Sequence, residues 1–141
     1  MLTGAMGPTE GYATVAGKDI RTQTQSIRED IGICLQHDCL FPQLTVREHV
    51  QFFSRVKGLY KEMSWEAAEE HIDQVIQDVA LSEKRNSMSK NLSGGMKRKL
   101  SVAIAFCGGS KIILLDEPTS GMVSFTARLV AIGRMLCFVL H

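Results

Sequence analysis

The residues best suited to chemistry lie in two short stretches, and the first of them is ILLDEP (113–118). Asp116 and Glu117 directly follow an apolar run, and Pro118 prevents a strand from continuing its ladder. Open α/β sheets bind ligands at the carboxyl ends of their strands. Because adjacent carboxylates repel, we expect divided roles, with Asp116 holding Mg²⁺ and Glu117 polarising a water nucleophile. The alternative is a strand that ends in a solvated acidic turn.

The second stretch is NLSGGMKRKL (91–100), which places Ser93, Gly94 and Gly95 where a helix should begin. The serine hydroxyl and the unobstructed backbone N–H groups could bind an anion such as a phosphate. Three cations follow at 97–99, although cations near a helix N-terminus oppose the helix dipole. A bound phosphate would compensate for them. The alternatives are a plain serine cap and a solvated basic face.

The composition narrows the class of protein without identifying it. The chain has 141 residues, which suit one domain, with 45% hydrophobic and 22% charged residues and a net charge of +1. This balance gives no argument for a nucleic-acid partner. Four cysteines without metal-like spacing predict buried free thiols in a reducing compartment. No secretory signal and no run of about 18 apolar residues is present in the sequence. His37, His49 and His71 are interpreted as surface groups.

The elements that must position these residues alternate between strands and helices. Short apolar runs predict strands at 12–16, 31–35 and 112–115. Thr45 and Glu48 have the spacing of a capping box for a helix that ends at Gly58. Ser64 and Ser93 are predicted to cap two further helices, with residues 82–91 as a loop between them. The apolar stripe of the 65–79 helix is predicted to include Trp65, and that of the 45–58 helix to include Val56. The order favours an α/β fold.

Three segments together resemble the nucleotide-binding domain of ABC transporters, a family of P-loop NTPases. They are GICLQHDCLFPQLTVREH (32–49), LSGGMKRKLSVAIAF (92–106) and GGSKIILLDEPTSG (108–121). The closest likeness is to the A subfamily, which moves lipids. The resemblance covers about 1–122 and implies a partial α/β ABC ATPase domain. Its strands would flank a helical subdomain at about 40–107 that carries the signature motif, and residues 123–141 would be a divergent apolar tail.

The resemblance also implies roles and partners. Ser93, Gly94 and Gly95 match the signature motif, which would contact ATP held by a second, head-to-tail nucleotide-binding domain. Gln36 matches the Q-loop position, with a part in catalysis and in Mg²⁺ binding. Asp116 would bind Mg²⁺ and Glu117 would act as general base. The implied location is the cytoplasmic side of a membrane, through transmembrane domains that are not in this chain, and the insert is too short for the coiled-coil branch of the family.

The sequence departs from the family pattern at both ends. The phosphate-loop pattern G-x-x-x-x-G-K-[ST] does not occur in the 141 residues, so we expect them to be inactive alone. Val123-Ser124 stands where the family has Asp-Pro, and His141 cannot be assigned as a switch histidine. Residues 125–140 could form a helix on the sheet, an interfacial helix or unrelated sequence. We further expect the 111–116 strand to expose an edge. The alternative function is a non-catalytic fragment that binds a partner domain or has no role of its own.

Overall fold

A computed structural model describes residues 10–35, 39–116 and 136–140; for Asp116 and for 136–140 it describes the backbone alone. Its elements, in chain order, are β1 (Thr14–Val15), β2 (Lys18–Asp19), α1 (Thr24–Asp30), β3 (Ile31–Cys34), α2 (Val46–Val56), α3 (Leu59–Glu62), α4 (Trp65–Asp78), the 3-10 turns η1 (Ser82–Lys84) and η2 (Ser89–Asn91), α5 (Gly94–Phe106), β4 (Ile112–Asp116) and β5 (Leu136–Leu140). No helix among the described residues is both long and apolar enough to cross a bilayer.

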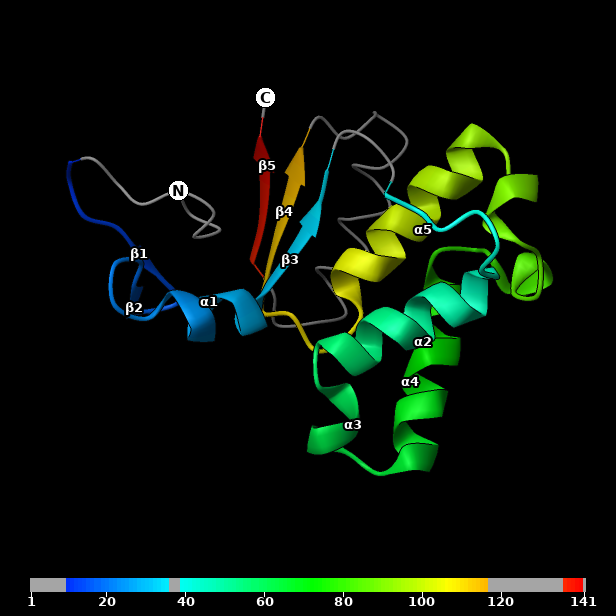
Figure 1. The fold of residues 1–141 in the computed structure, drawn as a ribbon, viewed down its shortest axis with the longest axis horizontal. Helices are drawn as coiled ribbons and strands as arrows, with labels where there is room; N and C mark the ends of the chain where they lie inside the picture. Colours follow the sequence, from blue (N-terminus) through cyan, green and yellow to red (C-terminus); the bar gives the residue numbers. More distant parts are fainter. Residues whose placement is uncertain (1–9, 36–38, 117–135, 141) are drawn as a thin grey trace.

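Two sheets form, and the larger one is parallel. Its strand order is β3-β4-β5, and Cys34 pairs with Leu115 while Asp116 pairs with Leu140. The carboxyl ends of the three strands therefore share one edge, as Figure 1 shows. β4 lies in the middle with a partner on each side. The expectation that this strand exposes an edge is thus wrong; among the described strands, β3 and β5 are the outer ones.

The smaller sheet is the antiparallel hairpin of β1 and β2. Its turn residues Ala16 and Gly17 both have positive φ, 51° and 75°, the geometry that matches the twist of a tight hairpin. The predicted strand at 12–16 is thus only two residues long, because the chain turns back directly after it. α1, which follows, is a seven-residue helix whose polar sequence gave no periodic signal.

α5 lies between the sheet and the other helices (Figure 1). Two of its faces are buried, one against each of these parts. One face, with Leu100, Ala103 and Cys107, packs into the core shared with α2 and α4. The other, with Val102 and Ala105, packs against β3 and β4. The approach to β3 is so close that a Cβ on Gly32 would lie 1.9 Å from the carbonyl oxygen of Ala105. The helix that begins at the predicted signature is therefore fixed to both parts.

The predicted side-chain caps at Thr45 and Ser64 are both confirmed. The Thr45 hydroxyl accepts a hydrogen bond from the backbone N–H of Glu48 at 3.2 Å, and the Glu48 carboxylate accepts one from the N–H of Thr45 at 2.7 Å. Ser64 caps α4. The stripes were partly wrong, because Val56 is 67% and Trp65 is 54% exposed. Trp65 instead lies beside Tyr60, with the Arg55 guanidinium 5.3 Å from each ring centroid.

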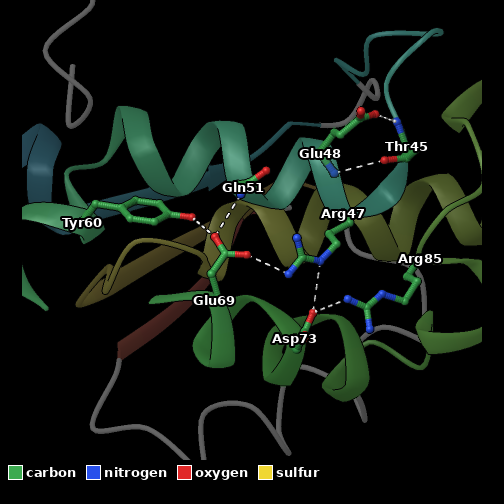
Figure 2. A network of polar contacts seen from close by, with 8 residues as sticks. All are labelled: Thr45, Arg47, Glu48, Gln51, Tyr60, Glu69, Asp73 and Arg85. Carbon is green, nitrogen blue, oxygen red and sulfur yellow. Dashed lines mark hydrogen bonds and ion pairs between the residues drawn. The ribbon is translucent and has the colours of Figure 1, made fainter. Parts of the chain in front are cut away.

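A polar network centred on Glu69 connects α2, α3 and α4 (Figure 2). The Glu69 carboxylate accepts hydrogen bonds from Arg47 at 2.7 Å, from Gln51 at 2.9 Å and from the Tyr60 hydroxyl. Burial raises the pKa of Glu69, but these hydrogen bonds outweigh it and hold the pKa below its ordinary value. Arg47 also lies 3.4 Å from Asp73. The helical part is therefore held together by ion pairs as well as by its core.

In the described part of the tail, residues 136–140, the structure shows a strand and not a helix. Residues 136–140 form β5, which pairs in parallel with β4 over five residue pairs beginning at Ile112 and Leu136. The sequence of the tail is apolar enough for either element. Pairing along β4 satisfies the backbone groups of both strands, which accounts for the strand.

Candidate functional site

Ser93 begins α5 as predicted. Its backbone is extended, with φ −65° and ψ 161°, and its hydroxyl oxygen accepts a hydrogen bond from the N–H of Met96 at 3.3 Å. Ser93, Gly94 and Gly95 are all exposed, so the first free N–H groups of the helix point toward accessible space. The structure thus confirms the helix start and presents its donors outward.

Nothing in the described part of the chain requires glycine at positions 94 and 95. Neither has a positive φ, and a Cβ built at either position meets nothing within 4 Å. Other glycines differ: a Cβ on Gly32 would clash with Ala105, and one on Gly108, whose φ is +80°, would lie 2.3 Å from Lys57 Cβ. Glycine in the first turn of a helix costs stability relative to alanine. The open side therefore fits the close approach of something outside the chain.

The three cations that follow this helix start differ in their contacts. Lys97, Arg98 and Lys99 are half-buried, and the first turn of α5 holds no acidic residue. Arg98 donates a hydrogen bond to the carbonyl oxygen of Leu35, just beyond β3. No ion pair to Lys97 or Lys99 occurs within the described residues. The first turns of α5 thus lie at the carboxyl end of β3 and keep a positive charge there.

The remaining predicted site residues lie, in the sequence, at or just after the ends of β3 and β4. β4 ends at Asp116, whose backbone pairs with Leu140, while its side chain is not described. Gln36 and Glu117 lie outside the described residues, as does His141. Gln36 comes two residues after β3 and Glu117 directly after β4. Since β3 and β4 are parallel neighbours, their carboxyl ends share the edge that the sequence predicted for ligands.

A metal site is supported by the ligand chemistry alone. Among the described residues, no group of three or more His, Cys, Asp or Glu side chains could hold a metal ion. The predicted Mg²⁺ ligands are one carboxylate, Asp116, and one amide, Gln36, and both supply the oxygen atoms that Mg²⁺ prefers. Mg²⁺ usually keeps several waters and takes phosphate oxygens as further ligands, so such a sparse protein set fits it.

His49 is a residue that the sequence interpretation placed wrongly. It was interpreted as a surface group, but its side chain is fully buried. Its Nε2 accepts the N–H of Phe41 at 2.9 Å, which leaves Nδ1–H to donate to the carbonyl oxygen of Thr45 at 2.8 Å. Burial lowers its pKa, and the bond to Thr45 offsets this only in part. The burial of His49 depends on the loop before α2, which folds back so that Phe41 contacts the ring. The position of a histidine in the first turn of a capped helix does not indicate such a contact.

The cysteines also differ in part from the prediction. Cys34 and Cys107 are buried free thiols, but Cys39 is exposed. Burial raises the pKa of Cys107 to about 11, so this thiol stays protonated near neutral pH.

Comparison with known proteins agrees with this geometry. The family model for ABC transporters matches residues 1–120. ATP-binding cassette sub-family A member 2 of Rattus norvegicus is 52% identical over 130 residues, which are 92% of this chain and 5% of that protein. The retinal-specific phospholipid-transporting ATPase ABCA4 of Mus musculus is 47% identical over 128 residues, 91% of this chain and 5% of that protein. The phospholipid-transporting ATPase ABCA3 of Rattus norvegicus is 46% identical, over 92% of this chain and 7% of that protein.

A solved structure shares the fold. It is the dimeric, post-hydrolysis state of the ATP-binding cassette MJ0796 bound to ADP and Pi, at a TM-score of 0.79 and 25% identity. The likeness covers 99% of this chain and 66% of that one. The family match over most of the sequence, the relatives and the fold all lead to one assignment: this chain belongs to the ABC transporter family and resembles the ATPase domains of its A subfamily.

Proposed function

We propose that this chain is part of the ATP-binding and ATP-hydrolysing domain of an A-type ABC transporter that powers the movement of lipids across a membrane. The names of two relatives, both phospholipid-transporting ATPases, support the substrate class. The chain spans only about 5–7% of the length of these curated relatives. The proposed ATP hydrolysis and lipid transport are therefore activities of a complete transporter.

The open start of α5 is the observation that carries this proposal. Gly94 and Gly95 leave the helix terminus unobstructed, and Ser93 offers its hydroxyl proton there while its oxygen caps the helix. A helix N-terminus of this kind suits the terminal phosphate of a nucleotide. The similar MJ0796 structure is a dimer bound to ADP and Pi, which supports pairing of two such domains. In our proposal, Ser93 to Gly95 close over ATP that a partner nucleotide-binding domain holds.

The residues at the carboxyl edge of the sheet would serve the nucleotide of the complete domain to which this chain contributes. Asp116 and Gln36 would hold Mg²⁺, which neutralises developing charge on the phosphates. Glu117 would take a proton from the attacking water, and it would need to reach that water within hydrogen-bond distance. These roles are carried over from the resemblance and from the strand order.

An exposed apolar surface supports contact with transmembrane domains. The rings of Phe41, Phe52 and Phe53 contact one another at the start and along the length of α2, with centroids 5.2–6.4 Å apart. Phe41 and Phe52 are 47% and 45% exposed, and Val56 continues the surface along the helix. Exposed apolar patches commonly mark interaction sites. In our proposal this surface faces the transmembrane domains of the transporter, on the cytoplasmic side of the membrane.

The test is nucleotide-dependent association in trans. The chain is mixed with a complete A-type nucleotide-binding domain that has its own phosphate loop, and its affinity is measured with no nucleotide, ADP and a non-hydrolysable ATP analogue. Of the three conditions, we expect only the ATP analogue to raise the affinity between the two domains, by more than tenfold. Hydrogen bonds to charged groups contribute about 1.5–3 kcal/mol each. Ser93→Ala should weaken this gain, while the backbone donors preserve part of it.

The control is Ser82→Ala, which changes an exposed serine in η1, eleven residues before Ser93. It should behave like the wild type. Equal affinity of the wild-type chain under all three conditions would contradict the proposal. The alternative, a non-catalytic fragment with at most nucleotide-independent binding, would then hold.

A further inference from the structure

The segment that carries the signature also holds the connection between β3 and α2. Hydrogen bonds run from residues 89–98 to described residues at both ends of the 35–44 segment. The N–H of Ser89 donates to Leu44 O at 2.9 Å and the N–H of Lys90 to Pro42 O at 3.3 Å. The Ser89 hydroxyl donates to Phe41 O at 2.8 Å. Arg98 donates to Leu35 O from the other end of the segment.

These contacts hold the connection on both sides of Gln36. Arg98 binds the carbonyl group just before Gln36, and the other three bonds reach residues that come after it. Gln36 itself lies outside the described residues. Both described ends of the connection contact one short segment, residues 89–98.

The backbone of Phe41 is held at both of its polar groups. Its N–H donates to His49 Nε2 at 2.9 Å, and its carbonyl oxygen accepts from the Ser89 hydroxyl at 2.8 Å and from the N–H of Leu44 at 3.1 Å. Ser89 is 2% exposed and His49 is fully buried, so water does not readily replace either partner. A residue whose N–H and carbonyl groups are both bound cannot shift without breaking one of these bonds. Movement of residues 89–98 must therefore move Phe41 or break the Ser89 bond.

Ser93, Gly94 and Gly95 lie between the two side chains that make the contacts. Ser89 precedes them in η2, and Arg98 follows them in the second turn of α5. Backbone hydrogen bonds connect the residues between them. The N–H of Leu92 donates to Ser89 O at 3.1 Å, and the N–H of Lys97 donates to Ser93 O at 2.9 Å. Only a few residues separate the helix start from Ser89 and from Arg98. A displacement of the helix start would therefore move both described ends of the connection.

We propose that Ser89 and Arg98 are positioning residues that couple the start of α5 to the connection between β3 and α2, so that engagement of Ser93 to Gly95 orders residues 39–44 of the same chain. The transmission rests on the proposed function, while the holding contacts do not.

The first experiment measures amide hydrogen exchange in the free chain. Ser89→Ala should speed exchange at the amides of Phe41 and Leu44 about threefold to tenfold, the effect of losing one net hydrogen bond. Arg98→Gln should speed exchange around Leu35, and Arg98→Lys, which keeps a donor, should restore most of the protection. Ser87→Ala is the matched control. Ser87 accepts the N–H of Val46 with its backbone oxygen, and the substitution keeps that oxygen.

The second experiment adds the complete partner domain and the ATP analogue. In the wild type, binding should slow exchange at Phe41 and Leu44 further. In Ser89→Ala, binding should persist while this slowing is lost, and Ser89→Thr should recover it. A merely structural role would lower overall stability without separating binding from the slowing.

The outcomes separate the two proposals. If the wild-type chain fails to bind with the ATP analogue, the proposed function fails and transmission fails with it, while the free-chain exchange still decides whether Ser89 and Arg98 hold the connection. Unchanged exchange at Phe41 and Leu44 in Ser89→Ala would overturn the positioning role. Equal slowing in the wild type and Ser89→Ala would overturn the transmission.

Discussion

The glycines of this chain show how one residue type serves different purposes at single positions. Gly32 is required by the fold, because a Cβ there would lie 1.9 Å from the backbone of Ala105. Gly94 and Gly95 are not required by it, because no described residue lies within 4 Å of a Cβ built at either position. Sequence alone cannot separate these cases, since the neighbour of Gly32 is more than seventy residues away in the chain. The spacing of a Ser-Gly-Gly motif, in contrast, is local and readable.

At Gly32 we predict that alanine prevents α5 from packing against β3. Overpacking a core typically costs about 1–3 kcal/mol, and a contact with rigid backbone should exceed that range. The measurement is urea unfolding of Gly32→Ala beside Gly95→Ala, whose new methyl group meets open space. Gly95→Ala should equal or exceed the wild type in stability. A Gly32→Ala variant as stable as the wild type would show that the helix and strand lie farther apart.

At the scale of elements, capping made the helices predictable while their contacts were not. Thr45, Ser64 and Ser93 cap three helices at the positions where the sequence placed them. A cap acts within three residues, so local sequence contains the whole signal. Burial depends on distant partners, which is why Trp65 was assigned to a core and His49 to the surface. α1 was missed because its seven residues carry only one buried apolar side chain, Ile27.

The Glu69 network is expected to contribute strongly to the helical part. In Glu69→Ala, three donors on α2 and α3 lose their acceptor, and Arg47 keeps Asp73 as its remaining acidic neighbour. Hydrogen bonds to charged groups contribute about 1.5–3 kcal/mol each, so a loss of at least about 2 kcal/mol in unfolding free energy is predicted. Glu70→Ala, an exposed glutamate beside it on α4, is the control. Equal stability of both variants in urea unfolding would contradict the role.

His49 makes stability depend on pH. Its pKa is lowered by burial in the folded chain, so below its ordinary value of 6.5 the unfolded chain binds a proton that the folded chain does not. Stability should therefore fall as pH decreases from about 7 toward 5, by at most about 1.4 kcal/mol per pH unit from this one group. His71, whose pKa is also lowered by burial, adds in the same direction. In His49→Gln the slope of unfolding free energy against pH should be smaller; an unchanged slope would assign it to other groups.

At the scale of the whole molecule, the strand order could not be read from the sequence. The strand at 112–116 was predicted from its apolar run, but its place in the middle depends on β5, in a tail without a family pattern. The fold class, the helical part and the positions of Ser93 to Gly95 followed from motifs. The contacts that connect residues 89–98 to 35–44 did not, because they join segments about fifty residues apart.

Assayed alone, the 141-residue polypeptide should not hydrolyse ATP measurably. A phosphate loop supplies most of the positioning in phosphoryl transfer, and loss of even one such donor typically costs about 10²–10³ in rate. The measurement is steady-state phosphate release, with Glu117→Gln as the companion variant. Sustained release that Glu117→Gln abolishes would contradict this prediction, since it would show a working site without the G-x-x-x-x-G-K-[ST] pattern.

The most direct test of the account is a comparison of stability and association in Gly94→Asp. No described residue lies within 4 Å of the new side chain's Cβ, and a carboxylate in the first turn of α5 interacts favourably with the helix dipole. The thermal stability of the variant should therefore equal or exceed that of the wild type. Its ATP-dependent association with a complete nucleotide-binding domain should nevertheless be lost, because the carboxylate would face the terminal phosphate. A stable variant that still associates as strongly as the wild type would show that α5 does not close over nucleotide.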